Sequence, residues 1–320
     1  MYIPIIIKEI SDNRNAIYGI SIILVILYHC YCNNESVFFL PFEKGFIGVD
    51  IFLLLSGYGL CHSYNNNNLR TFYKRRFMRI LPAYMTYNVL FFLMAAYYFK
   101  KPMSIADFFY NISTLSFYGF GYYGGGNKCF DWYTAAILLL YLLFPLLYKI
   151  ARKVGVIMFI LLCLFASVYN HFISVPWRID CLISRVPVFV FGILLYFYKK
   201  DLLQKEKNSH MRIVFLLLPA FIYAGLIYST WFFQTAMVAP FILLIVNGLI
   251  SLLQNTRIYC ALSYLGKYSY ELMVANSWSQ QWGIFIPKIF PLNVVCFILF
   301  HLIAQLLFIG VGKTVKVFIK

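Results

Sequence analysis

The chain has 320 residues, of which 62% are hydrophobic and only 12% are charged, and its formal net charge is +16. Soluble proteins carry about 25% charged residues, so this composition excludes an ordinary soluble domain. Apolar runs recur along the whole length, and an α-helix needs a run of about 20 such residues to cross a bilayer. Because backbone polar groups in lipid must be satisfied within the helix, the sequence predicts an all-α, polytopic integral membrane protein.

The apolar runs predict about ten transmembrane helices in a single transmembrane domain, residues 1–320, with no appended soluble domain. In chain order the predicted spans are 16–33, 46–63, 80–99, 131–148, 154–172, 183–198, 213–230, 235–253, 268–285 and 293–311.

The basic residues predict how these spans are oriented. Most of the 27 Lys and Arg residues fall on the inside if the N- and C-termini are both cytoplasmic, which is the usual asymmetry of membrane proteins. The expected location is the inner (plasma) membrane of the cell. A basic excess can also indicate nucleic-acid binding, but here the charges are divided among short segments between spans, so no nucleic-acid partner is expected.

Two ionisable residues in the first two spans are candidates for chemistry. His29 lies near the outer end of the first span, roughly 22 Å along the helix from Arg14, and Asp50 enters the second span from the outer side. Ionisable groups in a bilayer are costly and mark functional sites. A carboxylate that orients a neutral imidazole makes a general base for acyl transfer, so His29 and Asp50 are predicted as catalytic neighbours. The structural alternative is an interfacial histidine and a helix-capping aspartate.

A basic segment follows the second span, and we expect it to form a cytoplasmic loop that runs up to Pro82. It contains Arg75, Arg76 and Arg79 with aromatic residues beside them. Clustered guanidinium groups bind phosphates and stack on a nucleobase, and coenzyme A presents both. The alternative explanation is membrane topology together with contact to anionic lipid.

Three more residues are weaker candidates for the site. Arg185 and Glu271 lie near or within predicted spans, where each charge needs a partner, and the sequence allows pairing with each other or with Asp180. Trp132 heads the fourth span, where it suits an acceptor platform or an interfacial aromatic belt equally. The cysteine and histidine spacings predict no metal site.

Several segments resemble the family-3 membrane acyltransferases, which O-acylate surface glycans. Gly19–His29 is similar to the family's first span, which ends in its catalytic histidine, and Gly45–Tyr58 is similar to its second-span motif. The likeness continues almost to the end of the chain, through Arg75–Pro82, Asp131–Tyr133 with Tyr141–Pro145, Arg185–Pro187 with Phe191–Gly192, and Leu265–Leu272.

The resemblance implies an activity and roles for the candidate residues. The implied reaction moves an acyl group, usually acetyl from acetyl-CoA, to a hydroxyl of a cell-surface or exported glycan, with no bound cofactor. His29 would be the catalytic base and Asp50 would orient it, while the arginines of the basic segment would hold the phosphates of the donor. The alternative from another class is a transporter or flippase of lipid-linked or acylated glycans, since ten spans with a polar interior suit either.

Two positions depart from the family's pattern. Many members have an arginine eleven residues before the histidine, where this chain has Tyr18. Arg14, one helical turn earlier, is the candidate to replace that arginine in donor binding. The closing motif of the family often ends in a histidine, where this chain has Asn276.

Overall fold

A computed structural model describes residues 3–32, 37–97, 100, 103–119, 132–172, 177–203, 231–281 and 292–318. Every element in this part of the chain is a helix. The all-α class predicted from composition is therefore confirmed for the described residues.

Seven of the described helices are long and apolar enough to cross a membrane, which makes the protein a multi-pass membrane protein. They overlap the first four predicted spans and the sixth, eighth and tenth. The fifth predicted span is a shorter apolar helix, and the ninth corresponds to a helix of 13 residues. The seventh predicted span, 213–230, lies outside the described residues. The count of ten spans and the side on which each terminus lies stay predictions.

The chain forms two compact units, each assembled from three separate segments. Unit 1 comprises Met1–Val25, Lys44–Leu69 and Leu142–Lys267. Its described helices are α1 (Ile3–Asp12), the first part of α2 (Arg14–Cys32), α3 (Ile47–Asn65), the last part of α7 (Trp132–Val154), α8 (Val156–Phe172), α9 (Trp177–Ile183), α10 (Val186–Leu203), α12 (Trp231–Leu252) and α13 (Arg257–Lys267).

Unit 2 comprises Ile26–Glu43, Arg70–Tyr141 and Tyr268–Lys320. Its helices, within the described residues, are the end of α2, the short 3-10 helix η1 (Val37–Phe42), α4 (Leu69–Tyr97) from its second residue, α5 (Ile105–Ile112), α6 (Leu115–Tyr118), the start of α7, α14 (Ser269–Gln281) and α15 (Leu292–Phe318). The prediction of one transmembrane domain over residues 1–320 stays a prediction.

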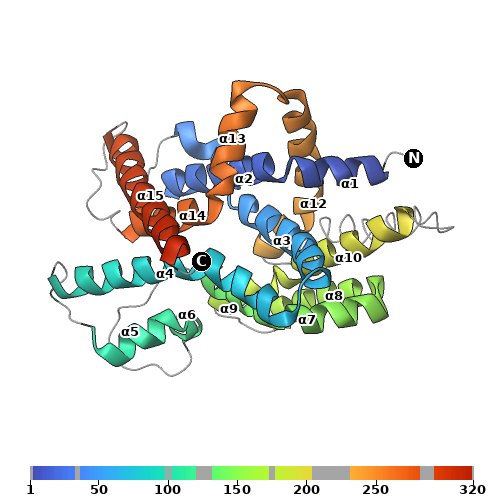
Figure 1. The fold of residues 1–320 in the computed structure, drawn as a ribbon, viewed down its shortest axis with the longest axis horizontal. Coiled ribbons are helices and arrows are strands. Elements are labelled where there is room, and N and C mark those ends of the chain that lie inside the picture. The colour runs from blue at the N-terminus through green and yellow to red at the C-terminus, as the bar shows by residue number, and fades with distance from the viewer. Residues whose placement is uncertain are drawn as a thin grey trace. The chain divides into compact units, whose positions relative to one another are not determined.

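In unit 1 the centre is the packing of α3 against α10 (Figure 1). Glycines make this close approach possible, because a Cβ on Gly57 would overlap the carbonyl oxygen of Phe189, and one on Gly192 would overlap that of Leu54. Small residues at helix crossings are how membrane helices bring their backbones together, since lipid supplies no hydrophobic force between them. The two glycines therefore fix α3 beside α10.

In unit 2 the end of α2 and helix α14 both pack onto α15. Cys30 and Phe297 are buried together, and Leu27 and Tyr31 cover them. This packing fixes the last turn of α2, which carries His29.

Helix α4 corrects the expected loop before the third span. The basic segment was expected to be a loop up to Pro82, but α4 begins at Leu69 and continues through Pro82 to Tyr97. Lys and Arg are good helix formers, and hydropathy detects only the apolar part of a helix. Proline is tolerated inside membrane helices, so Pro82 does not end α4.

Candidate functional site

In unit 2 the predicted catalytic histidine is hydrogen-bonded to Asn276. His29 lies in the last turn of α2 and is half-buried, whereas Asn276 on α14 is 1% exposed. The amide nitrogen Nδ2 of Asn276 lies 2.6 Å from Nδ1 of His29. A buried amide is costly without a partner, so this contact anchors both side chains. The position where the chain departs from the family's closing histidine thus contacts the predicted base directly.

In unit 1 the predicted Asp50 forms a buried ion pair with Arg185. Nε of Arg185 donates to Oδ1 of Asp50 over 2.8 Å, and the two side chains are 1% and 0% exposed. Arg185 lies in the turn between α9 and α10, where its Nη1 also donates to the carbonyl oxygen of Cys181. Two buried charges at this distance compensate each other.

The ion pairs in the structure answer one question that the sequence left open. Arg185 pairs with Asp50, and Glu271 lies 3.9 Å from Nη2 of Arg79. Asp180 accepts a hydrogen bond from the hydroxyl of Ser184. The expected pairing of His29 with Asp50 stays a prediction, because His29 belongs to unit 2 and Asp50 to unit 1.

The predicted phosphate-binding arginines lie on the first turns of α4 in unit 2. Because Arg75, Arg76 and Arg79 are spaced by one, three and four residues, helical geometry places Arg79 one turn beyond the other two. Arg75 is exposed and the other two are half-buried, and the side chain of Arg79 is 36% exposed. The buried carboxylate of Glu271 holds Arg79 at a distance longer than a charge-assisted hydrogen bond.

In unit 1 Arg14 and Tyr18 act as a pair. The hydroxyl of Tyr18 accepts hydrogen bonds from Nε and Nη2 of Arg14, at 3.1 and 2.8 Å. Nη2 also donates to the backbone oxygen of Leu55 on α3, and the guanidinium group fills the space that a Cβ on Gly59 would take. Tyr18, which stands where many family members have an arginine, therefore orients Arg14 one helical turn before it.

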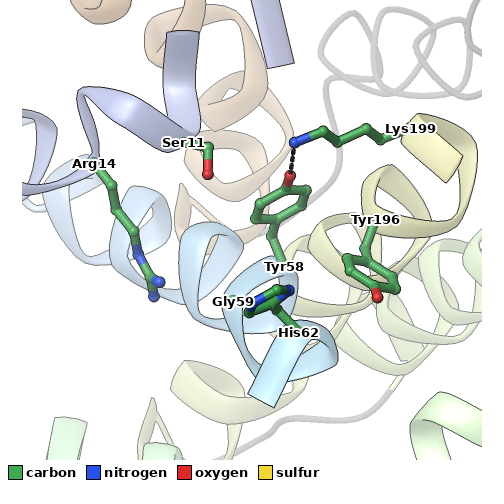
Figure 2. A pocket seen from close by; sticks show the side chains of 7 residues that line it. All are labelled: Ser11, Arg14, Tyr58, Gly59, His62, Tyr196 and Lys199. Carbon is green, nitrogen blue, oxygen red and sulfur yellow. Dashed lines mark hydrogen bonds between the residues drawn. The ribbon is translucent and has the colours of Figure 1, made fainter. Parts of the chain in front are cut away.

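A basic cavity of about 370 Å³ lies beside this pair, within unit 1 (Figure 2). Arg14 supplies one cation and Lys199, at the end of α10, supplies another. Nζ of Lys199 donates to the hydroxyl of Tyr58 over 3.1 Å. The remaining lining residues are Ser11, Gly59, His62 and Tyr196. Cations surrounded by hydroxyl groups form a site suited to a phosphate.

The structure adds residues that the sequence did not single out. Lys199 was visible only as one of the many cations between the predicted spans, and nothing in the sequence joined it to Tyr58 or to Arg14. Asn276 was visible as a departure from a motif, without a role. The one signal for the cavity was that Arg14 and Lys199 both lie at the predicted cytoplasmic ends of spans.

Trp132 is the first residue of α7 and is half-buried, with its ring edge-to-face against Tyr133 at 6.2 Å. Next to it in unit 2, the hydroxyl groups of Thr134 and Tyr270 are hydrogen-bonded at 2.9 Å. Trp132 as an acceptor platform stays a prediction.

Among the described residues no cluster of His, Cys, Asp and Glu could hold a metal ion.

Comparison with known proteins shows which protein family the chain resembles along most of its length. The model of the family 3 acyltransferase domain matches residues 15–309. The chain is also 24% identical, over 272 residues, to a protein of Acidianus two-tailed virus named "Putative acetyltransferase ORF330", covering 80% of this chain and 79% of that protein. No solved structure matches the chain.

Proposed function

Because the chain belongs to the family 3 acyltransferases, we propose that it transfers an acetyl group from acetyl-CoA to a hydroxyl of a cell-surface or exported glycan. That the protein is an acyltransferase follows from the family match, and the name of the viral relative supports acetyl as the group. The donor, the acceptor and the plasma-membrane location are the proposed parts.

The basic cavity carries the proposal for the donor. Acetyl-CoA bears phosphate groups, and these are recognised by guanidinium and ammonium groups with hydroxyl donors beside them. The cavity presents Arg14 and Lys199 in this way, and its volume of about 370 Å³ lies in the range of small-molecule sites, about 300–1,000 Å³. By the predicted topology this end of the helices faces the cytoplasm, where acetyl-CoA is made.

Arg14 is oriented before any ligand arrives. Its guanidinium group is held by the hydroxyl of Tyr18 and by the backbone oxygen of Leu55. A pre-organised cation loses little conformational freedom on binding an anion, which favours affinity. Arg14 with Tyr18 thus supports the substitution for the family's arginine that we propose.

The arginines of α4 are a second candidate for contact with the phosphates of the donor. Helical spacing gathers Arg75, Arg76 and Arg79 within about one turn. The side chain of Arg79 is 36% exposed and lies 3.9 Å from Glu271, so a phosphate can bind the guanidinium group while the buried carboxylate keeps its partner. Glu271 would hold the side chain of Arg79 in place for the donor.

His29 is the proposed general base for the transfer. It removes the proton from the hydroxyl of the acceptor, and the oxygen attacks the thioester carbonyl carbon of acetyl-CoA. The carbon–sulfur bond breaks, and the coenzyme A thiolate leaves with the proton that the imidazolium returns. Acetyl ester and coenzyme A are the products, and the histidine ends neutral. The family match favours this enzyme over a transporter.

The donor proposal is tested by acyl transfer from labelled acetyl-CoA with the purified protein in detergent. Lys199→Gln should raise the KM for acetyl-CoA about 10- to 100-fold, since a hydrogen bond to a charged group is worth about 1.5–3 kcal/mol. Lys313→Gln is the matched control, because Lys313 also lies over a tyrosine ring, that of Tyr268, and does not line the cavity. An equal KM in the two variants would refute the cavity as the donor site.

The acceptor is tested by mass spectrometry of surface glycans from cells that lack the protein, complemented with wild type or with His29→Ala. Acetyl groups that return only with the wild type would support the proposal and identify the acceptor. A change in glycan amount or export, with unchanged acetylation, would refute it and favour the transporter.

A further inference from the structure

His29 and Asn276 are hydrogen-bonded although they lie far apart in the sequence. The side chain of His29 is half-buried and that of Asn276 is buried. Asn276 is 1% exposed and lies on α14, which packs against α15 in unit 2. Its Nδ2 approaches Nδ1 of His29 to 2.6 Å. The remaining amide oxygen Oδ1 has no hydrogen-bond partner within the described part of the chain. A buried, unsatisfied amide oxygen costs roughly 1–3 kcal/mol.

This arrangement has consequences for the proton on the imidazole. Nδ2 can only donate, so with Nδ2 facing it Nδ1 must accept, and the single proton of the neutral ring then lies on Nε2. A half-turn of the amide about the Cβ–Cγ bond exchanges Oδ1 with Nδ2. Oδ1 then accepts the proton of Nδ1, and Nε2 becomes the basic nitrogen.

Only the second arrangement is compatible with an imidazole that accepts a proton. An imidazolium carries protons on both ring nitrogens, so an amide N–H facing Nδ1 would meet another N–H. With Oδ1 in that place, the hydrogen bond persists from the neutral ring to the imidazolium. The amide stays uncharged throughout and moves no proton of its own.

We infer that Asn276 is the positioning residue of His29, and that its amide oxygen holds the Nδ1 proton so that Nε2 acts as the base. This inference rests on the proposed function, in which His29 takes the proton of the acceptor hydroxyl. The proton travels from that hydroxyl to Nε2 and from Nε2 to the departing thiolate, while the Nδ1 proton remains bonded to Oδ1. A neutral acceptor thus does here what a carboxylate does in other histidine sites.

The activity test compares variants that differ in hydrogen-bonding capacity. Asn276→Leu should lower kcat about 10- to 100-fold at nearly unchanged KM, as part of the ~10²–10⁴ that a general base contributes. Asn276→Asp should keep most of the turnover, because a carboxylate accepts the Nδ1 proton and cannot donate. If instead the amide N–H were the useful group, the aspartate variant would be as inactive as the leucine variant, and the inference would be wrong.

Asn88→Leu is the matched control for loss of a buried asparagine in the same unit. Asn88 is 2% exposed, and its Nδ2 donates to the backbone oxygen of Tyr84 within α4. The variant should leave kcat within about twofold of wild type, because it removes only a hydrogen bond from a side chain to the backbone within one helix. A loss of kcat equal to that of Asn276→Leu would reduce Asn276 to a packing role and overturn the inference.

A spectroscopic readout separates this inference from the proposed function. In the protein labelled with nitrogen-15 histidine, the signals of His29 are assigned by their loss in His29→Gln, and the nitrogen shifts report which ring nitrogen carries the proton. The expected result is the Nδ1–H form in wild type and in Asn276→Asp, and a mixture of both forms in Asn276→Leu. A dominant Nε2–H form in wild type overturns the inference. An Nδ1–H form in a protein without acyl transfer leaves the pairing in place and refutes the proposed function instead.

Discussion

Replacing one member of the buried pair of Asp50 and Arg185 should destabilise unit 1 strongly. The two side chains are 0% and 1% exposed and their charges lie 2.8 Å apart, which corresponds to about 6 kcal/mol of attraction at an effective dielectric constant of ~20. Most of this attraction offsets the cost of burying the two charges. Asp50→Leu or Arg185→Met leaves the other charge buried without its partner and should therefore cost about 3–5 kcal/mol.

The double variant Asp50→Leu with Arg185→Met distinguishes a lost ion pair from lost packing. It removes both charges, so its free energy of unfolding should lie well above the value expected if the two single losses were additive. The assay is the unfolding of purified protein with increasing sodium dodecyl sulfate in mixed micelles, followed by circular dichroism. Additive losses in the double variant would refute the ion pair as the source of stability.

Asp50→Asn connects this prediction with the reaction. The resemblance implies that Asp50 orients His29, a role that the inferred bond of Asn276 to Nδ1 replaces. If Asp50 is nevertheless the residue that orients the imidazole, this variant should lower acyl transfer by a large factor. Unchanged transfer would restrict Asp50 to its structural pairing with Arg185.

Three further outcomes are expected. His29→Ala should abolish acetylation at normal expression, because it removes the proposed base, and glycan mass spectrometry checks this; unchanged acetylation would exclude His29 from the mechanism. Arg79→Ala should raise the KM for acetyl-CoA in steady-state assays, whereas an unchanged donor dependence would contradict the role of α4. Gly57→Ala should cost about 1–3 kcal/mol in the unfolding assay, since its Cβ would overlap the backbone of Phe189. Gly248→Ala is the control for that substitution, because no described atom outside the neighbouring part of its own helix lies within 4 Å of the added Cβ, and equal effects would refute the close approach of α3 and α10.

Hydropathy located most spans because a helix that crosses a bilayer must consist of consecutive apolar residues. The predicted spans 46–63 and 131–148 correspond to α3 and to most of α7, and their limits follow from run length alone. The same criterion failed at the start of α4, where charged residues continue a helix beyond the apolar part. Helix propensity and hydropathy are different properties, and hydropathy marks only where the apolar part of a helix begins.

The motifs predicted which residues are important and left their partners undetermined. Gly57 and Gly192 lie in two segments that each resemble a motif of the family. The packing of α3 against α10 explains why neither position accepts a side chain. Tyr18 was recognisable as standing where many family members have an arginine. Its hydroxyl accepts two hydrogen bonds from Arg14, so its role is to orient that arginine. Both explanations depend on contacts between residues that spacing in the sequence does not relate.

The sequence by itself determined the class, the approximate position of most spans and the family resemblance, because composition, run length and local motifs are properties of contiguous residues. Only the tertiary structure joined Asp50 to Arg185, 135 positions away, and His29 to Asn276, 247 positions away. These partners are set by which helix faces meet, and the packing that decides this is specified by many weak contacts distributed over the whole chain.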